Sequence, residues 1–65
     1  MSQYIHIEAE EIKRVTDKAL LAVIDGDEYW LPLSQIADSD DYEGGETDVT
    51  LSITEWIAKE KGLGG

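Results

Sequence analysis

The 65-residue sequence predicts a small α+β domain, in which an antiparallel β-sheet carries one C-terminal helix. Three observations favour this fold class: apolar and polar residues alternate near the N-terminus, an Asp-Gly pair separates two apolar runs, and a helical segment with terminal capping signals closes the chain. A chain of this length forms at most one domain. We assign that domain to residues 1–63 and expect residues 64–65 to be a flexible glycine tail.

The first strand is expected over Tyr4–Val15. Ile5 and Ile7 alternate with polar neighbours, which is the period of a half-buried strand. Residues 9–14 also contain good helix formers, but their apolar positions fit a bulged strand that continues to a turn at residues 16–17. We therefore predict a strand with a bulge.

A β-hairpin follows. The apolar run Ala19–Ile24 ends in Asp25 and Gly26, the pair that supplies the positive φ angles of a two-residue type I′ turn. Residues 29–33 form the returning strand. Pro32 lacks a backbone donor, so it places this strand at a sheet edge or marks its end.

The remaining segments are an acidic loop, a short strand and a helix. Residues 38–48 are rich in carboxylates and glycine, and residues 47–51 alternate as a fourth strand. Ser52 and Glu55 fit a capping box at the start of a helix over residues 53–61. Residues 62–63, Gly-Leu, fit a Schellman motif at its end.

The order of elements is thus a three-strand meander, an acidic loop, a fourth strand and a helix that covers one face. Such a sheet either stays open or curls toward an SH3-like or OB-like barrel. The residues expected to build the core are Tyr4, Ile5, Ile7, Ile12, Val15, Leu20, Leu21, Val23, Ile24, Trp30, Leu33, Ile36, Val49, Leu51, Ile53, Trp56, Ile57 and Leu63.

Composition excludes several classes of function. The 15 acidic residues against 5 basic ones give a net charge of −10, which disfavours direct binding to nucleic acid or to an anionic membrane. No cysteine is present for a disulfide or a thiolate metal site. The longest apolar run is too short for a bilayer, and the N-terminus does not resemble a signal peptide, so we expect a cytoplasmic protein.

The sequence predicts no catalytic or metal chemistry. His6 is the only histidine and has no triad pattern around it. A calcium loop beginning at Asp38 would need glycine at position 43 and glutamate at position 49, where the chain has Glu43 and Val49. We therefore expect no enzyme activity, no cofactor and no metal.

The acidic middle of the chain is the candidate binding feature. No lysine or arginine lies between Lys18 and Lys59. An ordinary soluble surface mixes both signs, and a solvated acidic face that only aids solubility is the alternative to a surface that attracts a basic partner. The candidate partner-binding residues are Asp25, Asp27, Glu28, Asp38, Asp40, Asp41, Glu43, Glu46 and Asp48.

Three segments, TDKALLAVIDG at 16–26, EYWLPLSQI at 28–36 and EWIAKEKGL at 55–63, resemble small proteins encoded by phages and mobile elements. In size and charge the chain is similar to the DNA-mimicking anti-CRISPR inhibitors of type I Cascade. The resemblance implies an inhibitor that acts in the cytoplasm of a bacterial host and competes with nucleic acid for a basic channel of a CRISPR effector complex.

A different class of function stays open on the same residues. The chain would then be a phage accessory module that binds a protein partner through an exposed aromatic patch near Tyr29, Trp30 and Tyr42. Its acids would serve only solubility.

Overall fold

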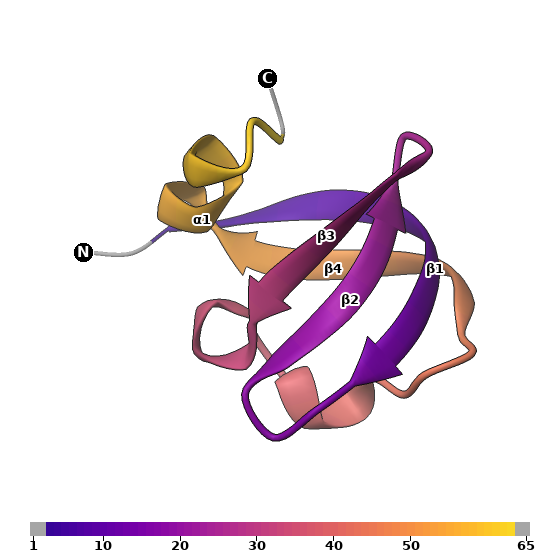
Figure 1. The fold of residues 1–65 in the computed structure, drawn as a ribbon. Helices are drawn as coiled ribbons and strands as arrows, with labels where there is room; N and C mark the ends of the chain where they lie inside the picture. Colours follow the sequence, from indigo (N-terminus) through magenta and orange to yellow (C-terminus); the bar gives the residue numbers. More distant parts are fainter. Residues whose placement is uncertain (1–2, 64–65) are drawn as a thin grey trace.

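The computed structural model describes residues 3–63 and has the predicted α+β fold (Figure 1). A four-stranded antiparallel sheet carries one C-terminal helix, and two short 3-10 turns lie between the third and fourth strands. The elements are β1 (Tyr4–Val15), β2 (Ala19–Ile24), β3 (Asp27–Pro32), η1 (Leu33–Gln35), η2 (Ser39–Asp41), β4 (Thr47–Thr54) and α1 (Glu55–Glu60).

Strand β1 lies at the centre of the sheet, whose order is β3-β2-β1-β4. Its first half pairs with β4, for example Ile7 with Leu51, and its second half pairs with β2, for example Ile12 with Ala22. The register against β2 shifts between Ile12 and Arg14, so the bulge is confirmed and the helical alternative is excluded. Figure 1 shows β1 curving strongly as it passes from one partner to the other.

The hairpin between β2 and β3 is confirmed. Asp25 and Gly26 have φ angles of 53° and 81°, which are the left-handed values that a type I′ turn needs at both central positions. Pro32 is the last residue of β3, and β3 is an edge strand, so proline removes no hydrogen bond from the middle of the ladder.

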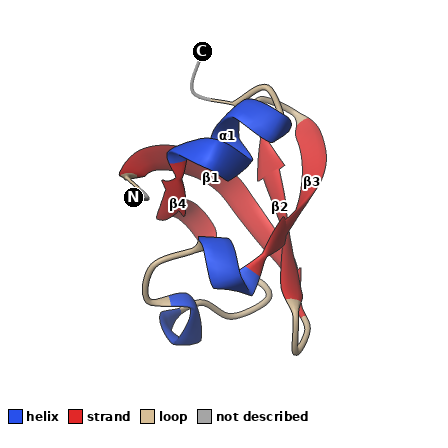
Figure 2. Cartoon of the chain, turned by 90° about the vertical axis from the view of Figure 1, so that its left-hand side faces the viewer, coloured by secondary structure: helices blue, strands red, loops and turns tan. Residues whose placement is uncertain are grey.

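The sheet is not closed into a barrel, so the open alternative is correct. The segment after η1 reaches the outer edge of β4, where Ile36 forms an isolated bridge with Ile53 and the Ala37 N–H donates to the Ser52 carbonyl over 2.8 Å. Figure 2 shows α1 toward one end of the sheet and the 3-10 turns toward the other. These elements cover the apolar interior that an open curled sheet would leave exposed.

The core lies inside the curl of the sheet. Its fully buried large side chains are Ile12, Leu20, Leu31, Leu51 and Ile53. Strand β2 alternates strictly between buried and half-buried positions, which is the expected pattern of a sheet with one face on the core. Four small or overlooked residues also belong to the core, namely Ala9, Ala22, Leu31 and Ala58.

The prediction that both tryptophans are core residues is wrong. Trp30 is 46% exposed and Trp56 is 60% exposed. Leu31 points inward from β3, so its neighbour Trp30 must point outward. Ile57 and Ala58 form the buried side of α1, which leaves Trp56 on the outside. Tyr4 and Val15, also expected in the core, are exposed near the two ends of β1.

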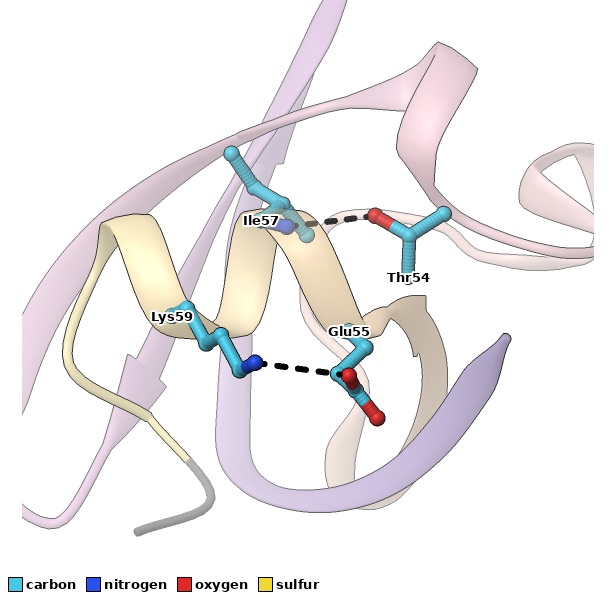
Figure 3. Close-up of polar contacts among 4 residues, drawn as sticks. All are labelled: Thr54, Glu55, Ile57 and Lys59. Carbon is cyan, nitrogen blue, oxygen red and sulfur yellow. Dashed lines mark hydrogen bonds and ion pairs between the residues drawn. The ribbon is translucent and has the colours of Figure 1, made fainter. Parts of the chain in front are cut away.

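The predicted start of the helix is also wrong. Strand β4 continues to Thr54, whose Cα pairs with Tyr4, so Ser52 lies within the strand. Thr54 has extended backbone angles and is the N-cap: its hydroxyl accepts from the Ile57 N–H over 3.2 Å (Figure 3). The same hydroxyl donates to the Gln35 side chain over 2.7 Å. The ladder with β1 therefore fixes where the strand ends and the helix begins.

Figure 3 also shows the partner of the Glu55 side chain. The predicted capping box paired Glu55 with Ser52, whereas in the structure it lies beside Lys59. Glu55 is the first residue of α1, and its carboxylate lies 3.5 Å from the Lys59 ammonium one turn later. Its backbone N–H donates to the Gln3 carbonyl over 2.7 Å. The start of α1 is thereby tied to the start of β1.

The predicted Schellman motif is confirmed. Gly62 has a φ of 72°, the Leu63 N–H donates to the Ala58 carbonyl over 2.7 Å, and the Gly62 N–H donates to the Lys59 carbonyl over 3.2 Å. Leu63 is buried, as the motif requires. The expected glycine tail, residues 64–65, lies outside the described residues. Within residues 3–63, no helix is long and apolar enough to cross a membrane.

If Thr54 is the N-cap, its replacement by alanine should destabilise the fold more than the replacement of Ser52 by alanine. Thr54→Ala should lower the free energy of unfolding by about 1 kcal/mol or more, because it removes a cap and a buried hydrogen bond. Ser52→Ala is the matched control and should cost less, since no hydrogen bond is made by its side chain in the described part of the chain. Urea denaturation measures both. A larger loss for Ser52→Ala than for Thr54→Ala would restore the capping box.

Candidate acidic binding site

The bend of β1 and the β2–β3 turn bring seven carboxylates to one end of the sheet. Four of them, Glu8, Glu10, Asp25 and Asp48, line a shallow hollow of about 340 Å³. The others flank it along the paired strands. We refer to these seven residues as the hairpin-end group: Glu8, Glu10, Glu11, Asp25, Asp27, Glu28 and Asp48.

Glu10 holds the hairpin turn against β1. Its Oε1 accepts a hydrogen bond from the Gly26 N–H over 2.6 Å. A carboxylate acceptor makes such a bond stronger than one between neutral groups. The tip of the β2–β3 hairpin is thus fixed beside the bend of β1, which keeps Asp25 close to Glu8 and Glu10.

A row across three strands extends the group. Glu11 pairs with Val23, and Val23 pairs with Glu28, so the two glutamates lie two strand spacings apart, about 10 Å. The Lys13 ammonium lies 2.9 Å from the Glu28 carboxylate. The hydrogen bond and the charge of Glu28 raise the pKa of Lys13 above its usual value. One lysine therefore lies among seven carboxylates.

The other acids of the middle segment form a second group in the loop before β4. We refer to it as the loop group: Asp38, Asp40, Asp41, Glu43 and Glu46. The Glu46 carboxylate accepts from the Glu43 N–H over 2.6 Å, which orders the turn between them. The loop is joined to β1 by the Gly45 N–H, which donates to the Ile12 carbonyl, and by the Ile12 N–H, which donates to the Glu46 carbonyl.

Tyr42 reports on the charge of the loop group. Burial raises the pKa of Tyr42 above its usual value, and the nearby charges of Asp38, Asp41 and Glu46 raise it further, while a contact with the backbone at Ser52 acts in the opposite direction. Its hydroxyl donates to the Thr50 carbonyl over 3.2 Å. The loop group is therefore anchored on β4 through a half-buried tyrosine.

The nine predicted binding residues are divided between these two groups. Asp25, Asp27, Glu28 and Asp48 belong to the hairpin-end group, and the remaining five make up the loop group. All nine are exposed except Glu46, which is half-buried. The structure thus assembles part of the predicted site at the hairpin end and leaves the rest around Tyr42.

The sequence prediction missed Glu8, Glu10 and Glu11. It selected acids from a stretch without lysine or arginine, and these three precede Lys13 and Arg14. The alternation of β1 did carry a signal, because Glu8 and Glu10 fall on the polar positions of a strand. The alternation does not reveal that β1 lies beside the hairpin turn, because that depends on how the strands pair.

The other basic residues lie elsewhere. Arg14 pairs with Leu21 beyond the bulge, and Lys18 lies in the β1–β2 turn, where its carbonyl accepts from the Leu33 N–H. That turn and the β2–β3 turn are at opposite ends of β2. Lys59 pairs with Glu55 on α1. Among residues 3–63, Lys13 is therefore the one basic residue at the hairpin end, while Arg14 lies beside Gly44 of the loop before β4 and Lys61 is the C-cap of α1.

The three aromatic residues of the alternative site do not share one face. Trp30 points outward and its Cα pairs with that of Leu21, whereas Tyr29, its neighbour in β3, packs against the core from the other side of the sheet. Tyr42 also packs against the core. Of the three, only Trp30 is exposed.

A second hollow, of about 480 Å³, adjoins the first and shares Glu8 and Asp25 with it. His6 lies at its rim, while Ile7, Ile24 and Leu63 supply apolar surface. Among residues 3–63, no three histidine, aspartate or glutamate side chains are placed to hold a metal ion. The geometry of the site is that of an acidic surface with shallow relief.

Comparisons with protein-family models, with curated proteins and with solved structures found no match to this chain.

The charge around Tyr42 predicts an alkaline titration. Because the folded protein holds the tyrosine proton more tightly than the unfolded chain, the stability from this group is present below the ordinary pKa of 10.0 and is lost as the pH rises through the raised value. The double variant Asp38→Asn, Asp41→Asn should lower the pKa of Tyr42, although burial should keep it above the usual value.

Phenolate absorbance measures this titration in a protein that also carries Tyr4→Phe and Tyr29→Phe, so that Tyr42 is the one tyrosine observed. Asp27→Asn removes a carboxylate that is not among the charges that shift the pKa of Tyr42, so it is the matched control and should leave that pKa unchanged. An unaltered titration in the double variant would show that these carboxylates do not lie around Tyr42.

Proposed function

We propose that this chain is a non-catalytic inhibitor that presents the hairpin-end group to a basic nucleic-acid-binding surface of a partner protein and competes there with nucleic acid. The observation that carries the proposal is the convergence of seven carboxylates, with one lysine among them, on one end of a small sheet. Such a field raises the rate of encounter with a basic surface and opposes acidic ones.

The density of charge supports a comparison with nucleic acid. Ten net negative charges along a longest dimension of 30 Å give about one charge per 3 Å. A single nucleic-acid strand carries one charge per about 3.4 Å, and a duplex one per about 1.7 Å. The chain therefore has an average linear charge density close to that of one strand.

The fixed turn at the hairpin end also supports the proposal. The Gly26–Glu10 hydrogen bond and the antiparallel pairing hold the carboxylates on a scaffold with little freedom. A surface that is ordered before binding loses less conformational entropy when the partner binds. The finer identity of the partner, a DNA channel of a type I CRISPR Cascade complex, is proposed from the resemblance in size and charge to DNA-mimicking inhibitors.

A second candidate function is attachment to a protein partner through apolar contacts. The exposure of Trp30, with Leu21 beside it on the outer face of the sheet, is the observation that favours it. Tryptophan is among the side chains that contribute most to protein interfaces. Binding of this kind would be almost independent of salt, whereas competition through carboxylates should weaken as salt rises.

Binding of target DNA to a type I Cascade complex in a gel-shift assay tests the proposal. The variant Glu8→Gln, Asp25→Asn, Glu28→Gln, Asp48→Asn should lose inhibition at least about tenfold, because four charge contacts disappear. The matched control removes the same number of charges from the loop group, through Asp38→Asn, Asp40→Asn, Asp41→Asn and Glu43→Gln, and should lose less. Circular dichroism confirms that both variants fold.

The two variants separate the alternatives. Unchanged inhibition by the hairpin-end variant, or no competition with DNA by the parent protein, would contradict the proposal. If inhibition instead resists salt and is lost in Trp30→Ala, the apolar candidate is correct.

A further inference from the structure

The two edges of the sheet are treated differently. The outer edge of β4 is covered by the chain itself: the Ala37 N–H donates to the Ser52 carbonyl, and the Tyr42 hydroxyl donates to the Thr50 carbonyl. Strand β3 forms the other edge. Within residues 3–63, no hydrogen bond joins another segment to the outer backbone groups of Glu28 and Trp30.

The register identifies which groups of β3 are available. The Leu33 N–H donates to the Lys18 carbonyl over 2.8 Å, so Leu31, Tyr29 and Asp27, at steps of two along the same register, also point their backbone groups toward β2. The N–H and C=O groups of Glu28 and Trp30 therefore point away from the sheet. An extended segment laid along β3 would meet these groups as hydrogen-bonding partners.

This edge lacks several of the features that normally prevent pairing, and its two acids, Asp27 and Glu28, oppose only an acidic segment. Native edge strands are protected by charged side chains, especially lysine, by proline, by bulges or by a covering segment. Strand β3 contains no lysine, and its proline is the final residue. Trp30 is exposed on the same strand and offers apolar surface next to the open backbone groups.

Charge selects the occupant of the edge. A second copy of this chain also carries a net charge of −10, so pairing of two such edges is opposed by repulsion. Asp27 and Glu28 occupy one end of β3, and the rest of the hairpin-end group lies beside them. A segment that carries lysine or arginine is attracted to this end.

We propose that the free edge of β3 accepts an extended segment containing lysine or arginine from the partner protein as a fifth strand, with Trp30 packing against it. The inference rests on the basic partner of the proposed function and names how that partner is held. Backbone pairing provides affinity. Side chains of the added strand contact Trp30, and its lysine or arginine side chains lie near the acids at the hairpin turn.

A short peptide of alternating lysine and valine is the probe, and amide hydrogen exchange followed by NMR is the measurement. The peptide should slow exchange of the Glu28 and Trp30 amides at least about tenfold, since both would gain backbone partners. A peptide of the same sequence in which every backbone amide nitrogen is methylated keeps the charge but loses the donors on both of its edges, and it should not protect these amides. A glutamate-valine peptide should not bind.

Two protein variants complete the test. Trp30→Ala should weaken binding of the lysine-valine peptide about tenfold, as expected for an aromatic anchor. Trp56→Ala removes a tryptophan of α1 that is more exposed than Trp30 and should leave binding unchanged.

Equal binding of the N-methylated peptide, or protection confined to residues outside β3, would overturn the inference. Protection of Glu28 and Trp30 without peptide, increasing with protein concentration, would overturn it in favour of a second copy. Neither result affects the gel-shift test. If Cascade inhibition fails while the peptide pairs with β3, the proposed competition with DNA is wrong and the edge site stands.

Discussion

The pairing of β1 with two different strands is the constraint on which the rest of the structure depends. The first half of β1 is held by β4 and the second half by β2, so the strand must bend between them. The bend curls the sheet around a core of residues such as Ile12, Leu20 and Leu51, and α1 and the 3-10 turns complete their burial. It also sets the start of β4 and the tip of the β2–β3 hairpin on either side of Glu8 and Glu10, so the same geometry that forms the core concentrates the acids.

The features predictable from the sequence were those fixed by near neighbours in the chain. The Asp25-Gly26 turn and the Gly62 motif each require a positive φ that few residues adopt, and the structure has it at both places. The helix start was not predictable in this way, because Ser52 and Thr54 are both good caps and only the ladder between β4 and β1 decides between them. The inward or outward direction of Trp30 likewise depends on which strand positions face the core.

The candidate site shows the same division between local and long-range information. The absence of lysine and arginine between Lys18 and Lys59 identified acids that are exposed, but an uninterrupted stretch of sequence is not a surface. In the structure, three glutamates of β1 lie beside the hairpin acids, and Lys13 forms an ion pair with Glu28. Bringing like charges together costs free energy, and the Gly26–Glu10 hydrogen bond and the Lys13–Glu28 pair offset part of that cost.

The concentration of negative charge at the hairpin end of the sheet can be measured directly. Paramagnetic relaxation of backbone amides by a cationic and by an anionic nitroxide cosolute measures the local electrostatic potential residue by residue, without any partner. We expect the cationic probe to be enriched over the anionic one most strongly at residues 8–11, 25–28 and 48, and least at residues 14–18. A ratio of the two probes that is uniform over the surface, or highest around residues 14–18, would contradict it.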